Sequence, residues 1–257
     1  MKRIHLFEFE DQSWFPSWLR ACITRMIIPM HRLLGTSEVV AEILAPALRE
    51  SGHHHILDLC SGSGGPMPEV IQKLEENHNL SNLNLVLSDL YPNQKMINSD
   101  LGSIIRYHPQ SVDATAIAKD LDGFRTIICG FHHMRPEIAK KILASAHQDK
   151  APILIFEMSD NSVPIVLSLL ALPINFILGF VVTLFVKPVT WQQILFTYLI
   201  PIIPIFFAWD GAISNMRTYT LSDMDELLEG LKTDDYVWKK EMVKKKAKML
   251  YLLGMPQ

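Results

Sequence analysis

The sequence has little excess charge of either sign and few cysteines. Its 257 residues contain 24 lysines and arginines against 27 aspartates and glutamates, a formal net charge of −3. A chain without a basic surplus lacks the general electrostatic footprint of nucleic-acid binding, so we expect no nucleic-acid partner. The three cysteines have no metal-ligand spacing, which predicts unpaired thiols in a reducing compartment. The first ten residues have no apolar core, so we expect no secretory signal.

Three adjacent histidines at 53–55 are the other potential metal ligands. Neighbouring side chains on an extended chain point to opposite faces, so three in a row do not converge on one ion. The sequence therefore predicts no metal site.

Charge is almost absent between Asp160 and Asp210, where Lys187 is the single charged residue. The run 163–186, as one helix rising about 1.5 Å per residue, is long enough to cross a hydrocarbon core of roughly 30 Å. A second apolar run, 194–208, follows a polar turn. We expect a hydrophobic helical hairpin that spans a membrane. The alternative is a pair of helices buried against a sheet face or in a dimer contact.

A loop of small residues follows a short apolar run in 56–65, which reads Ile-Leu-Asp-Leu-Cys-Ser-Gly-Ser-Gly-Gly. This pattern is typical of a buried parallel strand that turns sharply into a helix. Gly62 and Gly64 permit backbone angles that a Cβ forbids, and they let a ligand lie against the main chain. The next apolar run also ends in an acid, Asp89, which is placed to bind a ribose hydroxyl pair. Asp58 and Asp89, at successive strand ends, predict a site for a nucleoside-bearing cofactor.

These residues resemble the first motif of the class I S-adenosylmethionine-dependent methyltransferases. The resemblance covers roughly 50–160 and resumes after 210, and the later motifs fall in the family's order. It implies S-adenosyl-L-methionine as the cofactor, with Asp113 meeting the adenine amine. Cys60 stands where the commonest form of the first motif has glycine. The cofactor-binding residues that the resemblance implies are Asp58, Cys60, Ser61, Gly62, Gly64, Asp89, Leu90, Asp113 and Ala114.

Three polar residues at later strand ends are the candidates for chemistry. His132 and His133 follow the fourth predicted strand, and Glu157 ends the fifth. Side chains at the carboxyl ends of parallel strands face the crevice where ligands bind, and a neutral imidazole accepts a proton near neutral pH. We expect one histidine to act as a base or to position substrate, with Glu157 as a further polar contact. The alternative is that the histidines pack in the core or against the cofactor.

The predicted fold is α/β, with a Rossmann-like, mostly parallel seven-stranded sheet. We expect helices at 17–49 that break at Pro29, a helix capped by Ser222, and a closing antiparallel strand pair at 236–243 and 249–253. The predicted units are an N-terminal helical cap (1–49), a cofactor-binding core (50–162), the hydrophobic hairpin (163–208) and a C-terminal completion of the core (209–257).

Two further segments carry polar residues outside the motifs. An acidic patch at 8–11 precedes Trp14 and Trp18, which suits a membrane interface or a substrate lid as well as packing on the core. Asp210 and Arg217 are expected to pair with each other or to face the substrate.

The sequence thus predicts a methyltransferase acting on a small acceptor or on a lipophilic one delivered from a membrane. The expected localisation is multi-pass in a membrane, with the catalytic domain cytoplasmic and the basic turn 244–248 toward an anionic leaflet. The alternatives are a non-catalytic cofactor-binding protein and a membrane scaffold or assembly factor. The acceptor atom and the oligomeric state stay open.

Overall fold

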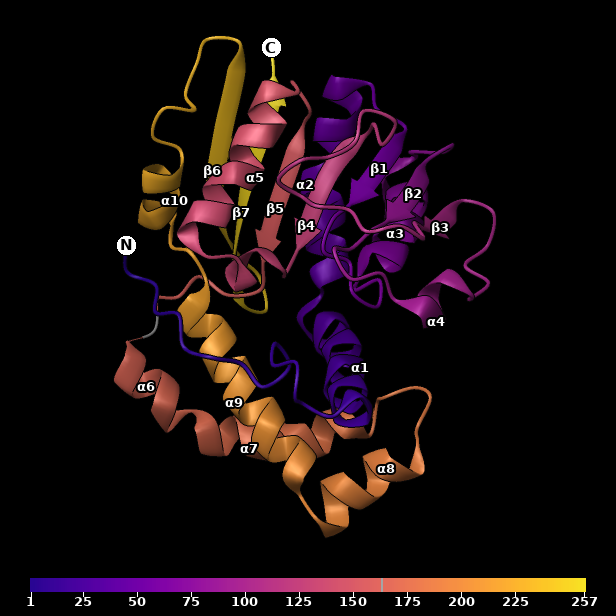
Figure 1. Cartoon of the computed structure of the whole chain (residues 1–257), viewed down its shortest axis with the longest axis vertical. Coiled ribbons are helices and arrows are strands. Elements are labelled where there is room, and N and C mark those ends of the chain that lie inside the picture. Colours follow the sequence, from indigo (N-terminus) through magenta and orange to yellow (C-terminus); the bar gives the residue numbers. More distant parts are fainter. Residues whose placement is uncertain (163) are drawn as a thin grey trace.

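The computed structural model describes residues 1–162 and 164–257, with the backbone alone at 165, 166 and 168. A seven-stranded sheet with helices on both faces forms one part of the molecule. A second group of helices lies beyond one end of that sheet, in the lower half of Figure 1. The N-terminal segment runs across the front of this second group, close to the end of the sheet.

The sheet combines five parallel strands with an antiparallel pair. The parallel strands are β1 (His55–Asp58), β2 (Asn84–Leu87), β3 (Ile105–Tyr107), β4 (Phe124–Ile128) and β5 (Ile153–Glu157). β6 (Tyr236–Lys244) and β7 (Lys248–Pro256) form a hairpin, and β7 pairs antiparallel with β5. The order is β3-β2-β1-β4-β5-β7-β6. The Rossmann-like, mostly parallel sheet is confirmed, and so is its closing antiparallel pair.

Helices cover both faces of this sheet, which explains why its central strands are apolar on both sides. α2 (Thr36–Ser51) and α3 (Met67–His78) pack on one face, in a core that includes Ile56. α5 (Pro136–Gln148) and α10 (Leu221–Leu227) pack on the other, in a core that includes Leu57. Successive residues of β1 thus enter opposite cores, as the pleat of a strand requires.

The helices beyond the sheet form what we term the helical lobe. Its elements are α6 (Ile165–Leu170), α7 (Leu172–Thr183), α8 (Trp191–Ile194), the π-helical segment η2 (Leu195–Leu199) and α9 (Ile202–Arg217). α1 (Ser17–Leu34) packs against the lobe, and Met26 shares a core with Val182 and Ile203. The lobe lies at the carboxyl ends of the parallel strands, which is the end where ligands bind in open α/β sheets.

Two predicted helix boundaries are wrong. The first helix continues through Pro29 and ends instead at Gly35, whose φ of 69° is the left-handed conformation that terminates helices. α10 is capped by Thr220 and not by Ser222. The Thr220 hydroxyl accepts the N–H of Asp223, and the Asp223 carboxylate accepts the N–H of Thr220, which is a capping box.

The predicted membrane-spanning hairpin is also corrected. The run 163–186, of which Val163 lies outside the described residues, is not one helix, because α6 ends at Leu170 and α7 begins again with Pro173 in its first turn. Proline lacks the N–H that a continuing helix needs. In the part of the chain that the structure describes, no single helix is long and apolar enough to cross a membrane. One bent pair, Trp191–Leu199 with Ile202–Arg217, passes by length and composition together, with a bend of 85°.

Candidate active site

The loop between β1 and α3 is held from inside the core by Asp58. The Asp58 carboxylate accepts hydrogen bonds from the hydroxyls of Ser61 at 2.5 Å and of Thr126, on β4, at 2.6 Å. Burial raises the pKa of Asp58 to about 7, against the two hydroxyl hydrogen bonds, which lower it. The predicted cofactor residue Asp58 therefore ties the loop to the neighbouring strand.

Gly62 and Gly64 of the loop have different structural roles. Gly62 has φ +52°, and a Cβ there would meet no atom within 4 Å, so its backbone borders open space. Its N–H donates to the Asp89 carboxylate at 2.9 Å. Gly64 has φ +94°, and a Cβ there would lie 3.3 Å from Leu87 of β2, so this glycine permits close packing on the sheet. Cys60 adopts φ 57° without being glycine, so the departure from the commonest motif keeps the left-handed turn.

A cavity of about 470 Å³ opens beside this loop, and we term it the loop cavity. The predicted cofactor residues on its wall are Cys60, Ser61, Gly62, Asp89 and Leu90. Helix α1 completes the wall with residues that the sequence did not single out, among them Arg20, Thr24 and His31. Burial lowers the pKa of His31 to about 4, which keeps its imidazole neutral. The cavity therefore combines loop backbone, the three acids Glu10, Asp11 and Asp89, and a helix from the N-terminal part of the chain.

Four predicted cofactor residues are not on this wall: Asp58 and Gly64, which shape the loop from behind, and Asp113 and Ala114. Asp113 is exposed, and its carboxylate accepts the N–H and the hydroxyl of Thr115 at 2.8 and 2.7 Å. Ala114 is buried in the core that contains Val112 and Phe131. The structure does not place these two on the wall of the loop cavity. Their contact with a cofactor stays a prediction.

A second cavity of about 260 Å³, the inner cavity, adjoins the first. The residues on the walls of both cavities are Glu10, Ile27, Cys129 and His133. Beyond this shared wall the inner cavity is lined by apolar side chains of α1, α7 and α9, including Met30, Leu178 and Phe207, and by polar ones such as Asn175 and Ser214. The polar pair His132 and Glu157 also lies on its wall. The two cavities could thus hold two molecules next to each other.

His132 and Glu157 form a buried pair. His132 lies in the short helix η1 (Phe131–His133) that follows β4, and its Nδ1 is 2.8 Å from Glu157 Oε2. The main-chain N–H of His132 donates to Glu157 Oε1 at 2.9 Å. Because the carboxylate accepts at Nδ1, this nitrogen carries the proton and Nε2 is the proton-accepting nitrogen. The two predicted strand ends are therefore brought together as an oriented pair.

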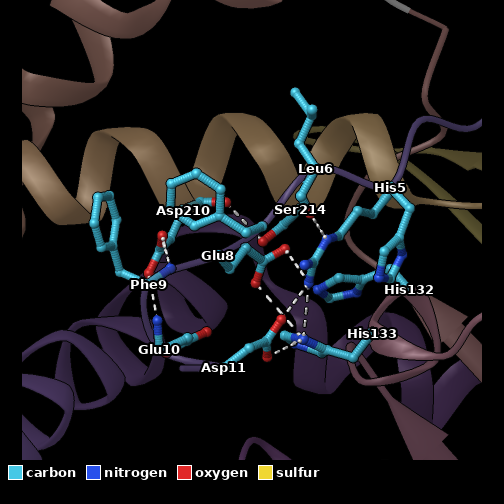
Figure 2. A network of polar contacts seen from close by, with 12 residues as sticks. His5, Leu6, Glu8, Phe9, Glu10, Asp11, His132, His133, Asp210 and Ser214 are labelled. Carbon is cyan, nitrogen blue, oxygen red and sulfur yellow. Dashed lines mark hydrogen bonds and ion pairs between the residues drawn. The ribbon is translucent and has the colours of Figure 1, made fainter. Parts of the chain in front are cut away.

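His133 belongs to a different network, shown in Figure 2. Its Nδ1 is 3.0 Å from Asp11 Oδ1, and the imidazole stacks on His132 with ring centroids 4.2 Å apart. Arg217 Nη1 donates to Asp11 Oδ2 at 2.6 Å. Burial alone would raise the pKa of Asp11, but the hydrogen bonds and charges of His133 and Arg217 outweigh it and lower that pKa. The second predicted histidine is thus fixed by the N-terminal segment and α9.

Glu8 is the most deeply buried acid of this network. Its side chain is 0% exposed, with Oε1 3.1 Å from Arg217 Nη1 and Oε2 3.6 Å from His133 Nδ1. Burial raises the pKa of Glu8 to about 7, while His133 and Arg217 lower it. The sequence shows the acidic patch at 8–11, but no pattern in it identifies Arg217 as the partner of these acids.

Helix α9 holds the N-terminal segment in place along the cavities. The Asp210 carboxylate accepts the N–H groups of Phe9 and Glu10 at 2.8 and 3.2 Å, and Arg217 Nε donates to the carbonyl of Leu6 at 2.7 Å. The predicted pairing of Asp210 with Arg217 is therefore wrong, since each binds the N-terminal segment instead. The segment builds part of both cavity walls.

One group of residues has the composition of a metal site. Ligand atoms of Glu8, His132 and His133 lie within 4.8 Å of one another. The guanidinium of Arg217 already contacts Glu8, so the negative charge that a metal cation would neutralise is already paired with a positive one. The geometry therefore favours an ion-pair network here. The histidines at 53–55 lie at the opposite end of β1 from the cavities.

Comparison with known proteins extends these observations. No protein-family model and no curated protein matches the sequence. Among solved structures, the plantazolicin methyltransferase BpumL in complex with SAH is 14% identical, with a TM-score of 0.58 over 96% of this chain and 94% of that one. The chain has the class I methyltransferase fold. A putative O-methyltransferase from Nostoc punctiforme is 10% identical, with a TM-score of 0.50 over 93% of this chain and 61% of that one.

Proposed function

We propose that the protein is an S-adenosylmethionine-dependent methyltransferase whose acceptor is a small, mainly apolar molecule with one ionisable group. The observation that carries this proposal is the pair of adjoining cavities. One borders a glycine loop and an acid, the other borders apolar helices and a histidine base, and they share a wall at Cys129 and His133.

The residues of the loop cavity fit the cofactor. The Gly62 backbone borders open space, so a nucleoside or amino-acid moiety can approach the main chain there. Asp89 uses its two oxygens to accept the N–H groups of Gly62 and Tyr91, and a carboxylate has further lone pairs for ribose hydroxyls. The structural neighbour BpumL holds SAH, the product form of this cofactor, within the same fold.

The inner cavity fits the acceptor. Its apolar side chains would bury an aliphatic or aromatic body, while its polar groups would orient one reactive atom. His132 Nε2 is the proton-accepting atom, and Glu157 holds the imidazole in that tautomer. We assign His132 the role of base and Glu157 that of the residue that positions it.

The chemistry divides between cofactor and chain. When bound, the cofactor supplies an electrophilic methyl group on a sulfonium sulfur. The chain aligns the acceptor, removes its proton at His132 Nε2 and keeps water out with the N-terminal segment and α1. The proton removed from an O–H or N–H group remains on the imidazole until it passes to solvent. Glu157 stabilises the imidazolium that forms, because the two groups are 2.8 Å apart.

Titration calorimetry with S-adenosylhomocysteine tests the cofactor half of the proposal. We expect one molecule to bind per chain, and Gly62→Val to abolish binding, because its side chain enters the cavity at a left-handed position that a β-branched residue avoids. Gly52→Val is the matched control, since Gly52 has φ +69° and open space around it far from the cavities. Absence of binding to the folded wild-type protein would refute the proposal.

A further inference from the structure

The outer face of the helical lobe is apolar and exposed. Fifteen exposed large apolar side chains among the residues that the structure describes lie between 167 and 205. The most exposed are Ile174 at 67%, Leu184 at 69% and Leu199 at 75%. Scattered exposed apolar residues are normal on a protein surface, but a concentration of this size marks an interaction site.

These side chains follow the period of a helix. The exposed residues Ile174, Ile177 and Val181 of α7, with Leu184 directly after its end, recur every three or four positions and form one stripe. The opposite side of α7 is buried and includes Gly179 and Val182. A helix on the surface of a protein surrounded by water normally has a polar outer stripe. α7 is apolar on both sides, so its outer stripe requires an apolar neighbour.

The scarcity of charge and the exposed aromatic residues indicate what kind of molecule covers this apolar face. The segment 161–209 contains no acid and a single cation, Lys187. Three exposed aromatic residues with a polar group, Trp18, Trp191 and Tyr198, lie on α8 and η2 or against them. Such side chains prefer the boundary between hydrocarbon and water. An interface with another protein carries a polar rim with about one hydrogen bond per 100–200 Å², which this face is poorly equipped to provide.

The shape of the lobe sets the depth of contact. α7 has 12 residues, or about 18 Å of helix, against roughly 30 Å of hydrocarbon core. The segment Trp191–Leu199 meets Ile202–Arg217 at 85°, so the bent pair does not run straight through a bilayer. Helices that do not cross a bilayer can lie in the plane of its interface, with an apolar face buried about 5–10 Å into the boundary between headgroups and acyl chains.

We propose that the outer face of the helical lobe, formed by α6, α7, α8 and η2, docks on a lipid bilayer and lies in the plane of one leaflet. Because α7 and α9 also line the inner cavity, through Leu178 and Phe207, the docked lobe separates the bilayer from that cavity by a single layer of helices. A lipophilic acceptor dissolved in the leaflet would then reach the site without crossing water. This last step rests on the proposed function, whereas the docking itself does not.

The test measures co-flotation of the full chain with phosphatidylcholine vesicles. We expect the wild-type protein to float with neutral vesicles in low and high salt, because the surface carries almost no charge. The variant Ile177→Gln/Leu184→Gln/Leu199→Gln should bind at least about tenfold more weakly, since three exposed apolar side chains are lost. The matched control Ile104→Gln/Ile138→Gln/Val237→Gln changes exposed residues outside the lobe and should float like wild type.

Three results would overturn the docking proposal. One is a wild-type protein that does not float, or floats only with anionic vesicles at low salt, which would point to the basic turn 244–248. Another is equal flotation of both triple variants. The third is a wild-type protein that does not bind vesicles and is a dimer by light scattering, while the lobe variant is a monomer. That result would make the face an interface between two copies. Flotation needs no cofactor, so its failure leaves the calorimetric test of the proposed function unaffected.

Quenching by brominated lipids tests the depth. The emission lost in Trp191→Phe reports on the tip of the lobe, and bromine near the headgroup end of the acyl chains should quench it most. Strongest quenching by bromine at the bilayer centre would contradict a position in the plane of one leaflet.

Discussion

Glu157 accepts both the main-chain N–H and the imidazole Nδ1–H of His132, at 2.9 and 2.8 Å. The double contact fixes the position of the imidazole and also its tautomer, so Nε2 is presented as an acceptor before any substrate arrives. Both residues lie on the wall of the apolar inner cavity. For this reason we propose His132, and not His133, as the base.

Single replacements of His132 and Glu157 should lower kcat and leave the affinity for the cofactor unchanged. His132→Gln should lower kcat by about 100-fold or more, since general-base catalysis contributes about 10²–10⁴. Glu157→Gln should lower kcat less, because the imidazole keeps its place but loses the carboxylate charge. Steady-state kinetics and calorimetry on the same preparations measure both effects. Wild-type turnover in His132→Gln would show that alignment alone suffices.

Replacement of His133 should have a different effect from replacement of His132. Because its Nδ1 is held by Asp11 in a network with Arg217, His133→Gln should change thermal stability more than kcat. A loss of kcat in His133→Gln as large as in His132→Gln, with an intact fold by circular dichroism, would contradict the assignment of the base.

Gly211 offers a way to block the inner cavity without strain. It lies within α9 on the cavity wall, and an added Cβ would meet no atom within 4 Å. Gly211→Leu should raise KM for the acceptor at unchanged affinity for S-adenosylhomocysteine. Thermal stability should hold or rise, since glycine inside a helix costs about 1 kcal/mol relative to alanine. Gly211→Ala is the control, and equal acceptor kinetics in wild type and Gly211→Leu would place the acceptor elsewhere.

Variants of Asp89 and Asp113 test which of these two acids contacts the cofactor. Asp89 lies on the wall of the loop cavity, whereas Asp113 is exposed and bonded to Thr115. Asp89→Ala should weaken binding of S-adenosylhomocysteine by about 1.5 to 3 kcal/mol, the usual range for hydrogen bonds to a charged group. Asp113→Ala should have a smaller effect. The reverse order of the two affinities would mean that the loop cavity is not where the nucleoside binds.

Glu8 should make stability depend on pH. Burial raises its folded pKa to about 7 from an ordinary value of 4.5. Below pH 4.5 the group is protonated in both states, and between pH 4.5 and 7 only the unfolded chain ionises, so stability falls as pH rises to 7 and levels off above it. The loss amounts to about 3 kcal/mol at most. Urea unfolding of wild type and Glu8→Gln at pH 5 and 8 measures it.

The difference in unfolding free energy between wild type and Glu8→Gln isolates this acid, because other buried carboxyls contribute equally to both. Glu75→Gln, which changes an exposed acid, should follow wild type at both pH values. Parallel pH dependence in wild type and Glu8→Gln would show that Arg217 keeps Glu8 ionised throughout.

The fold and the loop cavity were largely predictable from sequence because their signals are local. An apolar run, the acids Asp58 and Asp89 and the glycines around 62 indicate a strand, a turn and a crevice without knowledge of the rest of the chain. The role of Asp58 in cofactor binding stays a prediction, and in the structure its carboxylate accepts the hydroxyls of Ser61 and Thr126. A buried acid and a ligand-binding acid look alike in a sequence.

The rest of the site depends on contacts between distant segments. Asp210 binds the backbone of Phe9, some 200 residues earlier, and no local pattern reveals such a partner. The pairing of His132 with Glu157 requires the register of β4 on β5, which the sequence does not specify. The hairpin prediction failed because hydropathy counts apolar length and ignores how Pro173 divides it into two helices.

The central claim is that a methyl group is transferred between the two adjoining cavities. The most direct measurement incubates the purified protein with methyl-labelled S-adenosylmethionine and a lipid extract, then identifies labelled products by mass. We predict label in an apolar compound, at a rate that falls in His132→Gln while cofactor affinity is kept. A protein that binds the cofactor but labels no compound in any extract would contradict the claim and would leave a cofactor-binding protein without turnover.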